Sequence, residues 1–124
     1  MTNGYFRYCN AQPDGLVQND CVCRAISYAS GLDYYKIEEK LYHIGKLLEC
    51  DPLCVECYEI LLTDYFGYKP IDCEGLTLYE FAEQHPFGLY LVRSNGHISV
   101  LDDYCVIDIW DCRDMVLTNA WRIL

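Results

Sequence analysis

The chain has 124 residues, with 9 Lys and Arg against 19 Asp and Glu, and so a formal net charge of −10. We expect one domain, residues 1–124, and a hydrophobic fraction of 52% excludes a disordered chain. Nucleic acid is not expected as a partner, because affinity for it comes mainly from basic side chains that neutralise phosphates. Without an apolar run of membrane-spanning length or an apolar leader, we also expect no membrane partner and a cytoplasmic location.

The first third of the chain predicts an arm followed by two helices. Residues 1–15 contain Gly, Pro and Asn and predict an extended N-terminal arm. Asp20 is a candidate N-cap for a helix over 21–30 that stops at Gly31. The second helix, over 34–48, is indicated by apolar residues that recur at helical spacing.

Two more helices and a short extended piece are expected before the strands. An Asp-Pro pair at 51–52 opens a third helix that Gly67 ends, and residues 68–73 then read as extended. Residues 77–80 form a capping box for a short helix that must end before Pro86.

From Gly88 onward the pattern becomes extended. Asn95-Gly96 is a strong hairpin signal, and Asp102-Asp103 suits a second turn. The predicted strands are Leu89–Ser94, 97–101, 104–110 and 115–124. We therefore predict an α+β fold in which N-terminal helices pack on a C-terminal antiparallel β-meander.

Nine cysteines, an odd number, are expected to be free thiols. Cys50, Cys54 and Cys57 stand close together, and the last two form a CxxC motif. A structural zinc site would need further ligands, for which only Cys73 or His43 offers itself. The alternative is that these thiols are small apolar groups on a helix, so we predict no metal and no cofactor.

A reactive thiol is indicated at Cys21. In the first turn of its helix, free N–H groups and the helix dipole favour an anion, which lowers a thiol pKa. A nucleophilic Cys also needs a base, and three histidines are present. His43 reads as a solvated helix residue and His85 as a turn residue, whereas His97 starts a strand from which a ring can point at a helix end.

An acceptor that orients the imidazole would complete a triad. If residues 102–103 form a two-residue turn, the register places His97 directly opposite Asp108. A three-residue loop centred on Tyr104 would instead place Asp111 there. We take Asp108 as the first choice.

An oxyanion hole needs hydrogen-bond donors beside the nucleophile. The backbone N–H of Cys21 is one candidate. Gln18 or Asn19, just upstream, could supply a side-chain amide as the second, and we predict Gln18.

At these positions the chain resembles papain-like cysteine peptidases, in the small form found in bacteriophage and prophage proteins. Residues 19–26, Asn-Asp-Cys-Val-Cys-Arg-Ala-Ile, are similar to the start of the nucleophile helix of that family. A helix, a His-Pro-x-Gly turn, a Gly-His strand and an Asp-x-Trp-Asp strand follow in the family's order, at residues 77–82, 85–90, 96–97 and 108–111.

The resemblance implies Cys21 as the nucleophile, His97 as the base and Asp108 as the residue that orients it. One departure concerns the oxyanion glutamine, which in the family usually stands five or six residues before the Cys. Here Gln18 stands three residues before it and Gln12 nine.

The resulting prediction is a cysteine peptidase-like hydrolase that acts on an amide or related acyl bond of a peptide or protein substrate. The alternative is a non-catalytic phage accessory protein with a papain-like fold that binds and inhibits a host defence protein. The acidic charge would suit that alternative, because an acidic surface can occupy a basic groove on a partner.

Overall fold

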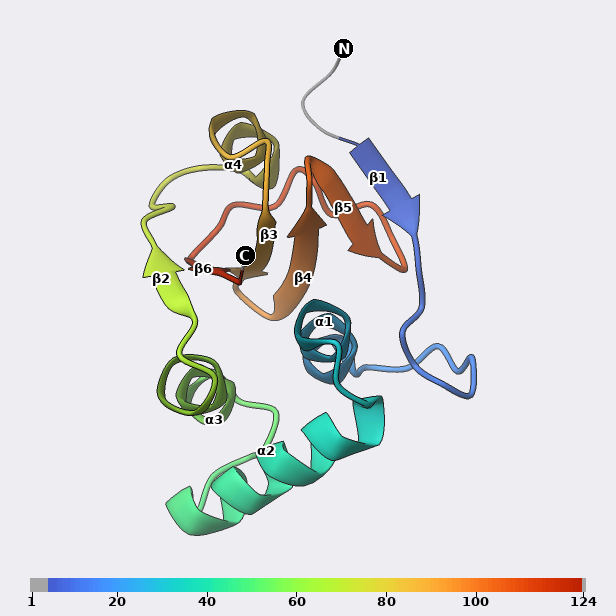
Figure 1. Ribbon diagram of the computed structural model, residues 1–124, viewed down its shortest axis with the longest axis vertical. Helices are drawn as coiled ribbons and strands as arrows, with labels where there is room; N and C mark the ends of the chain where they lie inside the picture. The colour runs from blue at the N-terminus through green and yellow to red at the C-terminus, as the bar shows by residue number, and fades with distance from the viewer. Residues whose placement is uncertain (1–4, 124) are drawn as a thin grey trace.

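The computed structural model describes residues 5–123, which form an α+β fold of four α-helices, one π-helical turn and six strands (Figure 1). The helices are α1 (Cys21–Ser30), α2 (Tyr34–Leu48), α3 (Val55–Ile60), continued by the π-helical turn η1 (Leu61–Tyr65), and α4 (Leu78–Gln84). The strands are β1 (Tyr5–Tyr8), β2 (Lys69–Ile71), β3 (Leu89–Ser94), β4 (His97–Asp102), β5 (Cys105–Asp108) and β6 (Asn119–Arg122). Within the described residues, no helix combines the length and the apolar character needed to cross a membrane.

The strands form a single mixed sheet in the order β1-β5-β4-β3-β6-β2. The expected antiparallel meander is present as β3, β4 and β5, but the sheet extends beyond it on both sides. Part of the expected N-terminal arm, residues 5–8, becomes β1 and pairs parallel with β5. The rest of the arm that is described, residues 9–15, has no regular structure, and residues 1–4 lie outside the described part.

The last strand differs from its prediction in length and in place. Instead of following β5 over 115–124, it covers only Asn119–Arg122 and pairs with β3 on the other side of the meander. The chain before it is held at the start of α4, where Leu78 N donates to Met115 O and Leu117 N donates to Leu76 O. These bonds use the backbone groups that a longer strand would have needed for sheet pairing.

Helices cover the two faces of the sheet unequally. One core lies between the sheet and α1, α2 and η1, and includes Ile26, Leu41, Leu91 and Trp121. The other lies on the opposite face under α4 and is built around Phe81. Both α1 and α4 are therefore held by packing against strands, with α1 packed mainly on β4.

The helix starts follow the predicted signals with two differences. Asp33 caps α2, accepting from the N–H groups of Tyr35 and Lys36, and the capping box of α4 is formed. Asp20, the expected cap of α1, makes no side-chain cap bond, because its carboxylate is taken up by other partners described below. The third helix begins only after Cys54, since residues 51–54 form a turn in which Cys54 N donates to Asp51 O.

The turn between β4 and β5 sets the register of the site. Asp103 and Tyr104 are its central residues, with positive φ values of 45° and 72°, as a type I′ hairpin turn requires. Asp102 consequently pairs with Cys105, and Val100 with Ile107. The predicted turn at 102–103 is therefore wrong by one residue, and the register by two.

Candidate active site

Three elements meet at one end of the sheet. The first residue of α1 is Cys21, the first of β4 is His97 and the last of β5 is Asp108. Because β4 and β5 run antiparallel, the start of one lies beside the end of the other, next to α1 (Figure 1). The fold thus brings a thiol from the early part of the chain to an imidazole and a carboxylate from the late part.

His97 and Asp108 are joined directly. Nε2 of the ring donates to Oδ2 of the carboxylate at 2.8 Å, and the two side chains are 14% and 4% exposed. The prediction placed the two residues directly opposite each other in the ladder, and the structure does not. Continuing the observed register places Trp110 opposite His97, and the two ring centroids are 4.8 Å apart. Because the register differs from the prediction by two residues, the Asp108 side chain stays on the same face of the sheet as His97. His97 therefore reaches Asp108 diagonally, across to the neighbouring strand.

The Asp108 carboxylate is saturated with donors. Oδ2 also accepts from Ser99 Oγ at 2.6 Å and from Cys112 Sγ at 3.5 Å, while Oδ1 accepts from Ile109 N at 2.7 Å and lies 3.7 Å from Nη2 of Arg24. Burial would raise the pKa of Asp108, but the hydrogen bonds from the histidine, Ser99 and Ile109 outweigh it and lower the pKa. The group is therefore held as a carboxylate.

Cys21 and His97 shift each other's pKa values in opposite directions. Burial raises the pKa of the half-buried Cys21 thiol, but hydrogen bonding with His97, a backbone hydrogen bond at Ile98 and the charges of His97 and Arg24 bring it below its ordinary value. Burial lowers the pKa of His97, but hydrogen bonds with Asp108, Cys112 and Cys21 raise it to about 11. The arrangement thus favours a thiolate beside an imidazolium.

A buried ion pair supports the start of α1. Arg24, 7% exposed, pairs with Asp20 one turn earlier and donates from Nη1 to Gln18 O at 3.1 Å. Tyr34 Oη donates to the other oxygen of Asp20 at 2.6 Å. Sequence reasoning did not assign Arg24 a role at the site. The sequence feature that could have indicated such a role is a charged residue on the otherwise apolar buried face of α1.

The other acidic and histidine candidates lie elsewhere. Asp111 is exposed and pairs with Arg113 at 2.7 Å. His43 is exposed on α2, and the ring of His85 stacks on Phe81 at 4.3 Å between centroids. Of the candidates considered, Asp108 is the carboxylate that contacts His97.

The oxyanion candidates are arranged differently from the prediction. Asn19 lines the cleft beside Cys21 and His97, whereas Gln18 is not among its lining residues and interacts through its side chain with Tyr34. Gln12 is buried, and its Oε1 accepts from the N–H groups of two loop residues. Of the upstream residues that carry an amide, Asn19 is therefore the one that lines this cleft.

Comparisons with protein-family models, with curated proteins and with solved structures give no match. Any assignment of function therefore rests on the geometry of the site.

Cys21 and His97 open onto a cleft of about 390 Å³. One wall comes from α1 and β4, with Cys21 and His97, and the other from the start of α3, with Cys54 and Tyr58. Arg93 lines the cleft too, although its Nη1 atom is hydrogen-bonded to Thr118 and Asn119. The thiol is thus at the edge of a space that a ligand could enter.

Two groups of described residues bring three possible metal-ligand atoms within 4.8 Å of one another. One is His97, Asp108 and Cys112, and the other is Cys50, Cys54 and Cys57. In the first group, the facing nitrogen and oxygen of His97 and Asp108 are already joined by a hydrogen bond. That group is therefore satisfied without an ion, whereas in the second group the three ligand atoms that face one another are all sulfurs, and one of them, Cys57 Sγ, also donates to Asp51 O.

Proposed function

We propose that the protein is a papain-like thiol hydrolase that cleaves an amide or related acyl bond through Cys21, His97 and Asp108. The observation that carries this proposal is the position of the His97 ring, bonded to Asp108 through Nε2 and lowering the pKa of the Cys21 thiol. Thiol, imidazole and carboxylate in series are the components of a cysteine nucleophile with its base and its orienting group.

In the first half of the reaction, the Cys21 thiolate attacks the carbonyl carbon of the substrate. A C–S bond forms, and the electron pair of the carbonyl π bond moves onto oxygen. When this intermediate collapses, the bond to the leaving group breaks and the His97 imidazolium gives its proton to that group. An acyl-thioester on Cys21 remains.

In the second half, neutral His97 takes a proton from water, and the oxygen of that water attacks the thioester carbon. The C–S bond breaks, the acid product leaves, and the thiolate and imidazolium are restored. Because Asp108 occupies Nε2, the remaining ring nitrogen, Nδ1, is the one that exchanges protons on the Cys21 side. The carboxylate thus fixes the orientation of the ring and stabilises its charged form.

Stabilisation of the oxyanion falls to donors at the start of α1. The backbone N–H of Cys21 lies in the first turn, where such groups have no partner within the helix. Asn19, which lines the cleft, is the second donor that we propose in place of Gln18. Exchanging Asn19 for Ala should slow turnover more than exchanging Gln18 for Ala.

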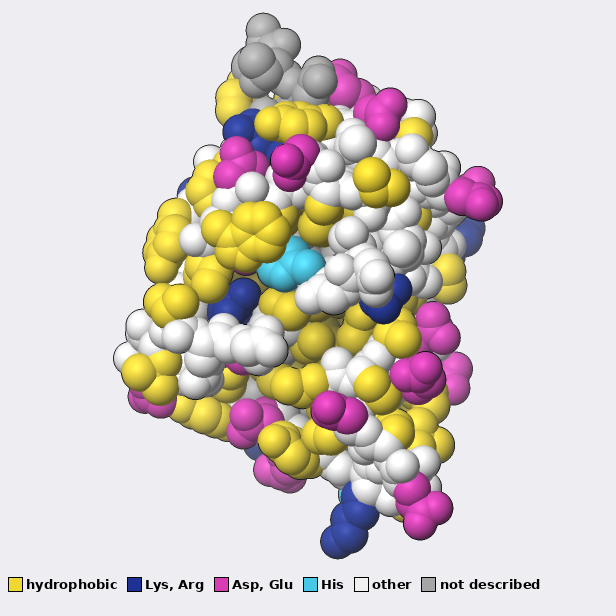
Figure 2. Space-filling model, turned by 180° about the vertical axis from the view of Figure 1, so that it is seen from behind, with side chains coloured by type: hydrophobic (Ala, Val, Ile, Leu, Met, Phe, Trp, Pro, Cys, Tyr) yellow, Lys and Arg dark blue, Asp and Glu magenta, His cyan; other side chains and the backbone are white. Residues whose placement is uncertain are grey.

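A peptide or protein segment fits the proposal as substrate, and the cytoplasm as location. The non-catalytic alternative, in which an acidic surface occupies a basic groove of a host protein, gains no support from the face shown in Figure 2. There the acidic side chains form separate patches divided by hydrophobic and uncharged ones. A hydrolase accounts better for the arrangement of Cys21, His97 and Asp108.

The test is competitive alkylation of the folded protein with limiting iodoacetamide, followed by peptide mass spectrometry. Cys21 should react first among the nine thiols, and His97→Ala should slow its reaction roughly tenfold for each unit by which the thiol pKa rises. Cys105, which is also half-buried but has a pKa raised by burial, is the internal control.

A panel of peptidyl amides and thioesters then tests turnover. Wild type should release the leaving group, and Cys21→Ala should not. Uniform labelling of the thiols, together with equal turnover by wild type and Cys21→Ala, would overturn the proposal.

A further inference from the structure

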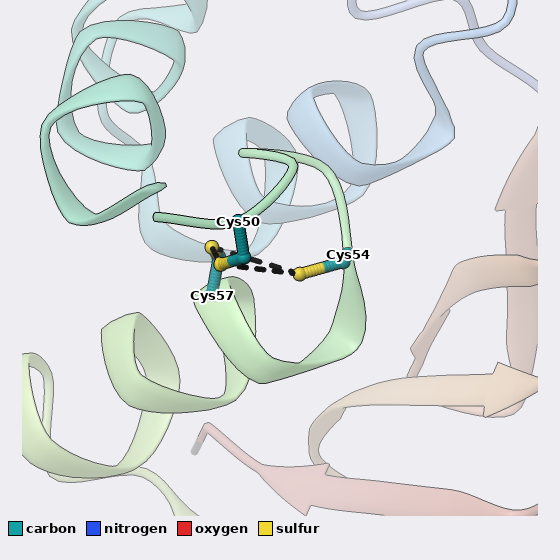
Figure 3. A group of neighbouring side chains, drawn as sticks. All are labelled: Cys50, Cys54 and Cys57. Carbon is teal, nitrogen blue, oxygen red and sulfur yellow. Dashed lines mark hydrogen bonds between the residues drawn. The ribbon is translucent and has the colours of Figure 1, made fainter. Parts of the chain in front are cut away.

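Three thiols lie close together in space at the corner between α2 and α3 (Figure 3). Cys50 follows α2, Cys54 is the N-cap of α3 and Cys57 lies in its first turn. The sulfur of Cys54 is 3.6 Å from that of Cys50 and 3.7 Å from that of Cys57, and the last two are 2.8 Å apart. We call this group the thiol cluster.

The backbone around the thiol cluster is arranged to bring the sulfurs together. Glu49 adopts a left-handed conformation, with φ of 56°, which turns the chain back after α2. Gly45 lets the returning loop approach, because a Cβ there would lie 2.9 Å from Cys50 O and 3.0 Å from Pro52 Cα. The loop thus packs against α2 at Gly45, and its Asp51 O accepts from Cys57 Sγ of α3 at 3.2 Å.

Contacts among neutral thiols contribute little to holding such an arrangement, since S–H is a weak donor and sulfur a weak acceptor. A tetrahedral metal with bonds of about 2.3 Å to sulfur has ligand atoms about 3.8 Å apart. Two of the three separations already have this value within 0.2 Å. The third, between Cys50 and Cys57, would open by about 1 Å on binding, starting from 2.8 Å.

We propose that Cys50, Cys54 and Cys57 form a binding site for zinc, with three thiolates from the chain and a fourth ligand from solvent. On binding, each thiol releases its proton and forms one Zn–S bond, and the hydrated ion keeps one water molecule. Cys50 and Cys54 are half-buried, so solvent can reach the fourth position. Sites with three protein ligands and one open position are a recognised class of zinc site.

The position of the site links it to the cleft. Cys54 lines the same cleft as Cys21 and His97, on the opposite wall. A bound ion would join the end of α2 to the start of α3 and so fix that wall. The inference does not depend on hydrolysis at Cys21, because it concerns a separate set of sulfurs.

The experiment uses the full chain, reduced, treated with excess Zn²⁺ and then separated from free ion. We expect one equivalent of zinc, measured by mass spectrometry of the metal. Co²⁺ in its place should give a sulfur-to-metal charge-transfer band of the intensity expected for three thiolates. Cys54→Ser and Cys50→Ser, both at half-buried positions, should each weaken zinc binding by more than about 100-fold. Losing a residue that only hydrogen-bonds to a metal ligand already weakens binding by ~10–100-fold, and these variants remove a ligand itself.

Two controls separate this site from the other thiols. Cys105→Ser, a half-buried cysteine on β5, and His97→Ala should both keep one equivalent of zinc. The proposal is overturned if the reduced wild type binds no zinc. It is equally overturned if zinc is lost in His97→Ala but kept in Cys54→Ser, or if Cys50 and Cys57 resist reduction as a disulfide.

Discussion

His97 and Asp108 are joined diagonally across two neighbouring strands, with 2.8 Å between Nε2 and Oδ2. Trp110, two residues beyond the end of β5, instead lays its ring beside the imidazole. The ring is thereby held on one side by an aromatic surface and at one nitrogen by a buried charge. This arrangement makes the protonation of His97 depend on Asp108.

Replacing Asp108 with Asn should lower the pKa of His97 from about 11 towards its ordinary value of 6.5. Burial already opposes the charged ring, and the substitution removes the negative charge that strengthens the hydrogen bond and helps to outweigh burial. NMR titration of the ring, assigned with His97→Ala, measures the shift. An unchanged His97 pKa in Asp108→Asn would contradict the structure.

The same pair makes stability depend on pH. When folding raises the pKa of a group, that group stabilises the folded protein fully at pH values below its pKa in the unfolded chain. This stabilisation is lost as the pH rises through the pKa in the folded protein. The free energy of unfolding of wild type should therefore fall relative to that of Asp108→Asn between about pH 6.5 and about pH 11. Urea denaturation of both proteins at several pH values is the measurement, and a constant difference would contradict the expectation.

The rate at which iodoacetamide modifies Cys21 should rise with pH around a midpoint below 9.0, the ordinary value for a thiol. The rate follows the thiolate fraction, which His97 increases. In His97→Ala the midpoint should move upward, because burial is then opposed only by the weaker remaining groups. Cys23, whose pKa burial raises to about 12, serves as the comparison and should stay unmodified over the same range.

Arg24 and Arg113 form a matched pair for testing burial of charge. Arg24→Met should lower the free energy of unfolding by about 3–5 kcal/mol, because it leaves the buried carboxylate of Asp20 without its cation. Arg113→Met breaks the more exposed pair with Asp111 and should cost less than about 1 kcal/mol. Chemical denaturation measures both, and equal effects would argue against a buried pair at Arg24.

Glu49→Gly should stabilise the protein by roughly 1 kcal/mol. A non-glycine residue in the left-handed conformation, as Glu49 is, costs about 1–2 kcal/mol, and glycine avoids this cost. Part of the gain is lost because glycine has more backbone entropy in the unfolded chain. Lys46→Gly, in the last turn of α2, is the control and should destabilise by about 1 kcal/mol. A loss of stability in Glu49→Gly would show that the side chain makes a contribution of its own.

The elements that local patterns specify were predictable from the sequence. The helix over 34–48 has a periodic apolar face, the capping box at 77–80 is a short-range signal, and both are present in the structure. Asn95-Gly96 likewise gives the expected hairpin, with Ser94 paired to His97.

Features that have no clear local signal, or that depend on distant parts of the chain, were not predictable in this way. Asp103 and Tyr104 form the β4–β5 turn although nothing in the type of Tyr104 signals a positive φ, so the register was missed. The parallel pairing of residues 5–8 joins segments about a hundred positions apart, as Tyr5 and Cys105 show. Asp108 was nevertheless chosen correctly as the partner of His97, because an error of two residues preserves the face of the strand.

The pairing of β1 has a practical consequence for work on this chain. Tyr8 lies beside Asp108 in the register, and Cys9 N donates to Asp108 O at 2.9 Å. The strand that carries the carboxylate is therefore bordered by the beginning of the polypeptide. Removing residues 1–10 would keep Cys21 and His97 in the chain but leave one edge of β5 without its partner strand. Loss of reactivity in such a truncated protein should therefore not be read as evidence against the proposed roles of Cys21, His97 and Asp108.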